Sequence, residues 1–376
     1  MKALILSCNT GEGHNSVAKA LGKYLEEQNV ECTVADTLSF LGTRFSKTIS
    51  DFYVYSTKNS IFKNIYRFGS LISSFLENTK SPVYTWNKSY SRKLYDYILD
   101  NKFDVIVCVH LFPAEAMTAL KINKDLSTPV IFIMTDYTCI PFLEETELDG
   151  YVIPHEHLIE EFAQNGIPRK KLYPFGIPVD KVFHNSASKL AARHKVAETF
   201  GWDIPEWHNW FLVMTGSMGF GNTQEIIDET IKQSLDDTEI ITVCGRNEKM
   251  FNRLNENNRY IHTVHTIGYT DQISLLMDAC DVLFTKPGGI SSTEAISKHI
   301  PIIHTAPIPG CETRNAEFFH YHGMSYSTTD PVKQVQIALQ LCHDKKFRKT
   351  MTGAQRLNAR PDTCQNILNL ITDQVS

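Results

Sequence analysis

Short runs rich in Val and Ile alternate with helix-length amphipathic segments along almost the whole chain. This alternation is typical of parallel sheets whose strands are joined by covering helices, and it predicts an α/β fold. The pattern restarts once, after Ile177-Pro178 and a polar stretch at 184–193 that we interpret as a linker. A chain of 376 residues is long enough for two domains.

We therefore expect two Rossmann-like parallel-sheet domains facing a cleft. The expected ranges are 1–183 for the N-terminal domain and 184–355 for the C-terminal domain. Residues 356–376 are expected to form a terminal helix that could belong to either half, and one possibility is that it packs back on the N-terminal domain. A helix is expected to start near His14. The predicted strands are Lys2–Ser7, Glu31–Ala35, Asp104–Val109, Val130–Met134 and Gly150–Ile153, then Phe211–Met214, Glu239–Val243, Tyr260–Val264, Asp281–Phe284 and Pro301–His304.

Cysteine spacing and apolar run lengths indicate the compartment. The nine cysteines are never closer than 22 residues, which excludes CxxC zinc and thioredoxin-type sites. Several lie in strand-like apolar runs, where a free thiol behaves as a small hydrophobe. No signal-peptide pattern follows Met1, and no apolar run approaches the roughly 20 residues of a membrane span. We expect a reduced, cytoplasmic protein.

The charge distribution is uneven. The net charge of −5 gives no overall basic field, so no nucleic-acid partner is expected. Residues 44–102 differ, with ten Lys and Arg against four Asp and Glu, many aromatics and a helical pattern. Such helices lie on anionic membrane surfaces, although a solvated basic face over an ordinary core is an equal alternative.

The first predicted strand runs into a glycine-rich turn, Asn9-Thr10-Gly11-Glu12-Gly13-His14. Backbone N–H groups in such a turn can face an anion. Asp36 lies where a dinucleotide-binding fold places its ribose acid, but Ser16 replaces the third glycine, so a dehydrogenase is a weak alternative. His14 at a helix start would be held neutral and could accept a proton, although a plain hydrogen-bonding role is the alternative.

The second half contains further small-residue turns after its strands. They are Thr215-Gly216-Ser217-Met218-Gly219, Cys244-Gly245-Arg246-Asn247, Gly268-Tyr269-Thr270, Lys286-Pro287-Gly288-Gly289-Ile290 with Glu294, and Pro309-Gly310-Cys311-Glu312 with Arg314 and Asn315. The Pro-Gly-Gly helix start can hold a pyrophosphate on its free N–H groups, while Glu294 one turn later can accept from ribose hydroxyls. A purely structural helix start is the alternative.

Taken together, this ordered set of motifs resembles the monogalactosyldiacylglycerol synthases and the processive diacylglycerol glucosyltransferases, over essentially the whole chain. These are GT-B enzymes of glycosyltransferase family 28, related to the peptidoglycan N-acetylglucosaminyltransferase MurG. The resemblance implies a metal-independent, cofactor-free and inverting transfer of glucose or galactose from a UDP-sugar to diacylglycerol. It also implies that the transfer takes place at the membrane surface. Together with the cysteine pattern and the basic aromatic segment, this leads us to expect a cytoplasmic enzyme held peripherally on an anionic membrane through residues 44–102.

The same resemblance implies roles for individual residues. His14 corresponds to the catalytic-loop histidine of the family, which is the base or the group that positions the acceptor. Apart from the resemblance, we expect Asp136 to be a second acid/base or a group that orients His14. The UDP-sugar would be held by Gly13, Gly216, Ser217, Gly219, Arg246, Asn247, Gly268, Tyr269, Gly288, Gly289, Ile290, Glu294, Glu312 and Asn315.

Two departures from the family pattern affect specificity. Cys311 replaces the usual glutamine before Glu312, which leaves the hexose open, and Tyr137 to Leu143 replace a histidine and a tryptophan on the acceptor side. These departures keep a non-catalytic UDP-sugar or lipid-binding protein as an alternative. A UDP-sugar 2-epimerase is a second alternative, because it would use UDP and the Glu294 turn on a similar two-domain scaffold.

Overall fold

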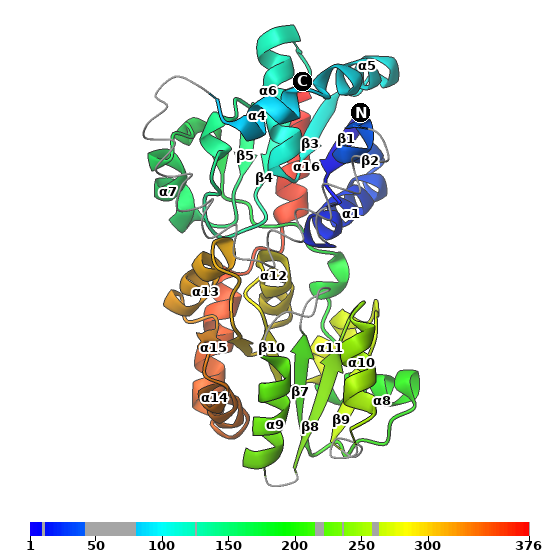
Figure 1. Ribbon diagram of the computed structural model, residues 1–376, viewed down its shortest axis with the longest axis vertical. Helices are drawn as coiled ribbons and strands as arrows, with labels where there is room; N and C mark the ends of the chain where they lie inside the picture. Colours follow the sequence, from blue (N-terminus) through cyan, green and yellow to red (C-terminus); the bar gives the residue numbers. More distant parts are fainter. Residues whose placement is uncertain are drawn as a thin grey trace. The chain divides into compact units, whose positions relative to one another are not determined.

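The computed structural model describes residues 1–9, 12–41, 80–124, 126–214, 222–234, 237–257 and 263–375. These residues form two compact α/β units (Figure 1). The first unit comprises Met1–Asp180, Pro309–Cys311 and Arg360–Ser376, and the second comprises Lys181–Ile308 and Glu312–Ala359. The chain thus returns to the first unit at Arg360.

The first unit is built on a six-stranded parallel sheet with the order β2-β1-β3-β4-β5-β6. The strand order reverses between β1 and β3, and right-handed crossovers therefore place α1 and α6 on opposite faces of the sheet. Its strands are β1 Lys2–Ser7, β2 Glu31–Asp36, β3 Val105–Cys108, β4 Val130–Ile133, β5 Gly150–Val152 and β6 Leu172–Tyr173. Its α-helices are α1 Glu12–Glu27, α4 Pro82–Lys88, α5 Ser91–Asn101, α6 Leu111–Lys124, α7 Ile159–Gln164 and α16 Thr363–Val375.

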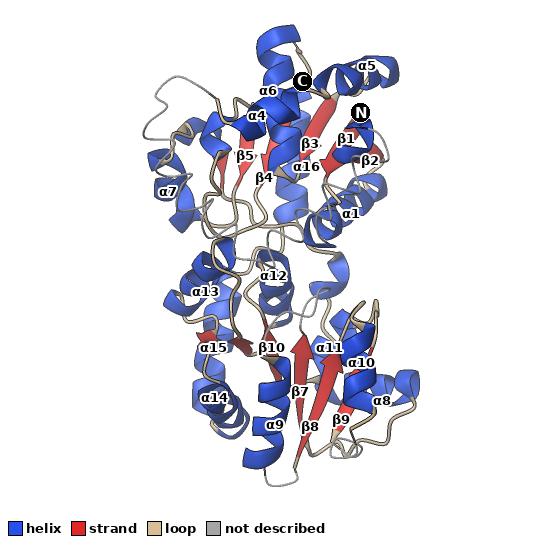
Figure 2. Cartoon of the chain, viewed as in Figure 1, coloured by secondary structure: helices blue, strands red, loops and turns tan. Residues whose placement is uncertain are grey.

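The second unit has a six-stranded parallel sheet with the order β12-β11-β10-β7-β8-β9, and its order reverses between β10 and β7. Helices flank the strands of both sheets (Figure 2). The strands are β7 Asn209–Met214, β8 Thr238–Val243, β9 Val264–Ile267, β10 Val282–Thr285, β11 Ile302–His304 and β12 Tyr326–Ser327. The helices are α8 Lys189–Phe200, α9 Thr223–Gln233, α10 Glu248–Asn255, α11 Ile273–Ala279, α12 Gly289–Lys298, α13 Cys311–Tyr321, α14 Pro331–His343 and α15 Lys345–Asn358.

Buried apolar strands hold each unit together. β3, β4 and β10 are buried along their whole length, as expected for central strands of a parallel sheet covered on both faces. In the second unit, the rings of Phe211 and Phe284 lie 5.3 Å apart within a core that helices α9 and α14 complete. Rigid central strands fix the loops at their carboxyl ends, where ligands of such folds bind.

The predicted α/β class with two parallel sheets is confirmed, and the cleft between them stays a prediction. Strand β9 runs over Val264–Ile267, because its pairing with β8 aligns Ile240 with Val264 and Val243 with Ile267, so of the described residues in the predicted strand Tyr260–Val264 only Val264 is in a strand. Residues 258–262 lie outside the described residues. The two-residue edge strands β6 and β12 were too short to be predicted.

The polar stretch at 184–193, interpreted as a linker, is partly helical. Helix α8 begins at Lys189, where the hydroxyl of Ser188 accepts a hydrogen bond from the Ala191 N–H. Arg193 is buried against Trp210 and pairs with Asp281, so its charge belongs to the fold of the second unit. Polar residues with these internal partners look like a solvated linker in the sequence.

Candidate active site

His14 lies near the start of α1, at the reversal of strand order in the first unit. Its Nδ1 atom is 2.8 Å from the carbonyl oxygen of Val109, the residue that follows β3. A carbonyl oxygen can only accept, so Nδ1 carries the proton and Nε2 keeps its lone pair. Burial lowers the pKa of His14, although the charge of Asp136 opposes this effect. The imidazole is therefore neutral at pH 7 and can take up a proton at Nε2.

Three residues that follow β3 or β4 lie beside His14. Thr135 and Asp136 follow β4, and the Thr135 hydroxyl is 3.3 Å from His14 Nδ1. His110, immediately after Val109, packs its ring edge-on against His14 with 4.6 Å between the ring centroids. Burial also lowers the pKa of His110 well below its ordinary value. The sequence analysis missed His110, although its place directly after a predicted central strand was a usable signal.

The turn after β10 leads directly into helix α12. Gly288 is the N-cap with extended backbone, and Gly289 and Ile290 are the first two helical residues. The first intrahelical bond of this turn runs from the Ser292 N–H to the Gly288 carbonyl at 3.1 Å. The N–H groups that precede it point outward from the helix end, where the helix dipole favours negative charge. Glu294, half-buried, lies one turn into the same helix.

A buried histidine, His304, contacts a serine of α12 and a second serine before β12. The Nε2 atom of His304, at the end of β11, is 3.0 Å from the Ser292 hydroxyl, and its Nδ1 atom is 3.0 Å from the Ser325 hydroxyl. All three side chains are buried, and burial lowers the pKa of His304 to about 3. The neutral ring therefore donates to one hydroxyl and accepts from the other, which links α12 to β11 and to the segment before β12.

Glu312 and Asn315, predicted to bind the sugar, are both engaged within the protein. Glu312 pairs with the Lys286 ammonium and accepts a hydrogen bond from the Ile308 N–H at 2.8 Å. Asn315 is buried and donates to the Pro287 carbonyl at 3.0 Å. Both side chains thus support the turn that starts α12. The ion pair with Lys286 is the contact that the sequence analysis did not anticipate.

The turns after β8 and β9 lie next to each other. The guanidinium of Arg246 stands 5.5 Å from the ring centroid of Tyr269, which is largely exposed. A side chain on Gly268 would approach the Gly245 carbonyl at 3.9 Å. Asn247 instead caps α10, accepting from the Met250 N–H at 3.1 Å. The structure therefore brings Arg246 and Tyr269 together and gives Asn247 a local structural role.

Other predicted residues are placed as follows. Gly13 is the second residue of α1, beside His14. Gly216, Ser217 and Gly219 lie outside the described residues, as does much of segment 44–102. Their predicted roles stay predictions.

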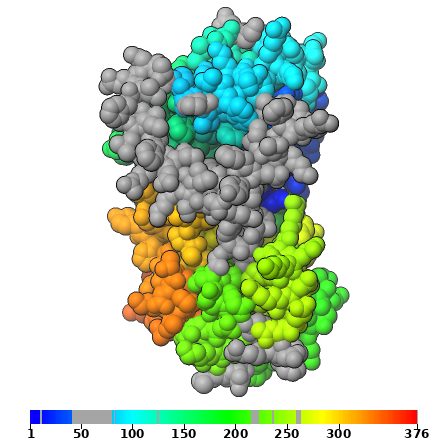
Figure 3. Space-filling model, viewed as in Figure 1, coloured from blue at the N-terminus to red at the C-terminus, as the bar shows by residue number. Residues whose placement is uncertain are grey.

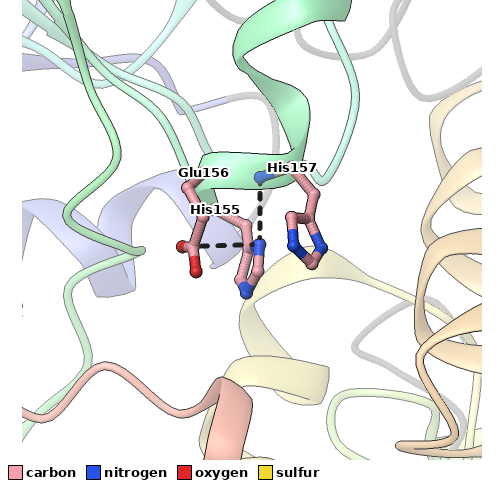
Figure 4. A group of neighbouring side chains, drawn as sticks. All are labelled: His155, Glu156 and His157. Atoms are coloured by element: carbon pink, nitrogen blue, oxygen red, sulfur yellow. Dashed lines mark hydrogen bonds and ion pairs between the residues drawn. The ribbon is translucent and has the colours of Figure 1, made fainter.

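Within the described ranges, one group of side chains has the spacing of a metal site: His155, Glu156 and His157, which precede α7 (Figure 4). His155 Nδ1 faces both the Glu156 carboxylate at 3.5 Å and the His157 backbone N–H at 3.2 Å. The guanidinium of Arg360 contacts His155 Nε2 at 2.9 Å and pairs with Glu156. Arg360 therefore ties the C-terminal segment to this cluster.

Comparisons with known proteins agree with this fold. Over 99% of both chains, the structure superposes on MurG of Acinetobacter baumannii with a TM-score of 0.62 at 12% identity. It also superposes on UDP-GlcNAc 2-epimerase of Neisseria meningitidis bound to UDP-GlcNAc, with a TM-score of 0.64 at 14% identity over 99% of this chain and 100% of that chain. The fold is the GT-B fold.

Sequence similarity shows which proteins with the GT-B fold this chain resembles. The family described as monogalactosyldiacylglycerol (MGDG) synthase matches residues 14–179. A processive diacylglycerol beta-glucosyltransferase of Bacillus cereus (strain G9842) is 26% identical over 98% of this chain and 93% of its own length. The predicted resemblance to these two groups of glycosyltransferases is thus confirmed. In the described part of the chain, every helix is too short or too polar to cross a membrane.

Proposed function

We propose that this protein is an inverting glycosyltransferase that moves glucose or galactose from a UDP-hexose to the free hydroxyl of diacylglycerol. The observation that carries the proposal is the contact of His14 Nδ1 with the Val109 carbonyl oxygen at the strand reversal of the first unit, which leaves Nε2 to accept a proton. Similarity over nearly the whole chain to a protein named for transfer to diacylglycerol supports the choice of acceptor. We favour glucose because that relative is named a glucosyltransferase.

The second unit would bind the donor. The free N–H groups at Gly289 and Ile290 would hold the pyrophosphate, and Glu294 would accept hydrogen bonds from the ribose hydroxyls. Arg246 and Tyr269 would lie beside the uridine, and the Lys286–Glu312 pair would face the hexose. The positive end of α12 would stabilise the charge that develops on UDP, the task that a metal ion serves in other transferases.

In the transfer step, His14 Nε2 would take the proton of the acceptor hydroxyl. The acceptor oxygen forms a new bond to the anomeric carbon, while the bond from that carbon to the β-phosphate oxygen breaks and leaves its electron pair on UDP. The products are hexosyl-diacylglycerol, UDP and one proton. Attack opposite the leaving group inverts the anomeric centre. Exclusion of water during this step would prevent hydrolysis of the donor.

A peripheral membrane position is part of the proposal. The described end of the basic aromatic segment includes α4 and α5, which lie on the surface of the first unit, cyan in Figure 3. Its five basic side chains are all exposed: Lys80, Lys88, Arg92, Lys93 and Lys102. Each basic residue near an anionic surface contributes about 1 kcal/mol of attraction. Charge reversal at Arg92 and Lys93 should weaken sedimentation with anionic vesicles and leave UDP binding unchanged.

Release of UDP from purified protein tests the function. UDP-glucose and UDP-galactose are supplied in turn, with and without diacylglycerol in anionic vesicles. Release that depends on lipid supports the transferase and names its sugar. Conversion of a UDP-sugar to its epimer without acceptor would instead support a UDP-sugar 2-epimerase, which shares this fold. UDP or lipid binding without turnover would support a non-catalytic role.

A further inference from the structure

Four aromatic rings follow one another from helix α4 to His14 in the first unit. The ring centroid of Trp86 is 5.4 Å from that of Phe112, which is 4.6 Å from His110, which in turn is 4.6 Å from His14. All three contacts are edge-to-face, the arrangement that aromatic pairs prefer. We call these four residues the aromatic row. It joins α4, the start of α6 and the start of α1 (Figure 1).

The two ends of the aromatic row differ in character. Trp86 and Phe112 are partly exposed and apolar, whereas His110 is buried and His14 presents the Nε2 lone pair. Trp86 is also the only tryptophan in the sequence of the first 180 residues. A ligand lying along the row would meet apolar rings at one end and a proton acceptor at the other.

A buried polar network fixes the positions of Trp86 and Phe112 relative to each other. Asn87, next to Trp86, donates to the Glu115 carboxyl group one turn beyond Phe112. The Tyr90 hydroxyl donates to Asn87 Oδ1 at 2.6 Å, and the Tyr90 ring packs on Trp86. Asn87, Tyr90 and Glu115 are all buried. The network therefore locks α4 onto α6 directly behind the row.

The charge state of this network suits an apolar ligand. Glu115 is fully buried, and its Oε1 atom has no hydrogen-bond partner. Burial raises the pKa of Glu115 to about 8, so the carboxyl group is mostly protonated at pH 7. A raised pKa at Glu115 lowers the negative charge beside α4 and α6, which favours contact of Trp86 and Phe112 with hydrocarbon.

We propose that the aromatic row is the binding subsite for the acyl-glycerol part of the lipid acceptor, with the acyl chain on Trp86 and Phe112 and the free hydroxyl at His14. This inference rests on the proposed function, since it names the part of the first unit that the acceptor contacts. An amphipathic lipid matches the aromatic row because it has an apolar chain at one end, which can contact the apolar rings, and a hydroxyl at the other, which can reach Nε2.

Fluorescence quenching tests the contact without turnover. Diacylglycerol with brominated acyl chains, in vesicles, quenches tryptophan on contact, and the other three tryptophans lie in the second unit at 202, 207 and 210. We expect the brominated lipid to quench the fluorescence of the unaltered protein. The conservative variant Trp86→Phe should lose this quenching but still sediment with the vesicles. Equal quenching of the two proteins would overturn the proposal. This readout stays informative even if the protein transfers no sugar.

Steady-state kinetics provide the second readout. Trp86→Ala should raise the KM for dioctanoylglycerol about tenfold, the order expected from losing a buried aromatic contact, with kcat and the KM for UDP-sugar nearly unchanged. Trp86→Phe should have a KM for dioctanoylglycerol close to that of the unaltered protein, and the exposed Trp207→Ala serves as the matched control. A lower kcat for Trp86→Ala, with the KM for dioctanoylglycerol unchanged, would show that Trp86 only supports the fold.

Discussion

The Nδ1 atom of His14 lies 2.8 Å from the carbonyl oxygen of Val109, and this contact determines which ring nitrogen can act as a base. The two residues are 95 positions apart in the chain and meet because β1 and β3 are neighbours in the sheet. The proposed chemistry of the first unit therefore depends on strand order as well as on the glycine-rich turn.

Replacing His14 should stop transfer and leave donor binding intact. His14→Ala removes the proton acceptor, and loss of a general base typically lowers kcat by about 10²–10⁴-fold. The affinity for UDP, measured by calorimetry, should be unchanged. The exposed His194→Ala is the control. Near-normal lipid-dependent turnover in His14→Ala would remove His14 from the mechanism.

The pH profile provides an independent check on the same residue. Because burial lowers the pKa of His14 below 6.5, the base stays unprotonated as the pH falls through that value. The ratio kcat/KM should therefore hold down to pH 6.5 and decline only in more acidic solution. A decline centred above pH 6.5 would contradict this account.

Glu115 should make the fold less stable as the pH rises. Its carboxyl pKa is raised from 4.5 to about 8, so the folded state binds a proton that the unfolded chain has lost in this interval. The stabilising contribution is complete below pH 4.5 and is lost towards pH 8, by at most about 1.4 kcal/mol per pH unit. Glu115→Gln stays neutral and should flatten this part of the curve in urea unfolding. Parallel curves for the two proteins would show that Glu115 is ionised in the fold.

The two serines beside His304 should have different effects on UDP binding. Each alanine variant removes one hydrogen bond of about 1 kcal/mol from the same buried ring, so similar losses of stability are expected. Only Ser292 belongs to α12, and Ser292→Ala should also weaken UDP binding several-fold in calorimetry. Equal UDP affinities for Ser292→Ala and Ser325→Ala would mean that His304 has no part in positioning α12.

Gly176 should tolerate no side chain. Its φ is +104°, and a Cβ atom there would stand 2.5 Å from the Thr363 hydroxyl oxygen and 2.8 Å from the Arg360 Cβ. We expect Gly176→Ala to cost more than about 2 kcal/mol in urea unfolding. Gly201 also has a positive φ but has open space around it, so Gly201→Ala should cost only about 1 kcal/mol. Equal losses would show that the C-terminal segment can yield at Gly176.

Much of the architecture could be predicted because central parallel strands are short, apolar and bounded by small residues. β1, with its pattern of buried residues from Ala3 to Ser7, matches its predicted range. β9 was harder because its middle residues, His265 and Thr266, are polar and only partly buried. Periodicity gives no clear strand boundary in such a segment.

The candidate site was predictable only in its local parts. Consecutive residues determine where α12 begins, so the helix start at Gly288 and Gly289 could be predicted from the sequence alone. The Lys286–Glu312 pair and the burial of Asn315 arise from packing between turns, which no local pattern encodes. The contact between Trp86 and Phe112 likewise depends on how α4 docks on α6.

Isolation of the product tests the central claim most directly. Purified protein is incubated with UDP-glucose carrying a labelled sugar and with diacylglycerol in anionic vesicles, with UDP-galactose in a parallel reaction. We predict label in a lipid whose mass equals diacylglycerol plus one hexose, with a β-anomeric linkage by NMR, and none with His14→Ala. Recovery of the label only as free or epimerised sugar, with intact diacylglycerol, would contradict the account.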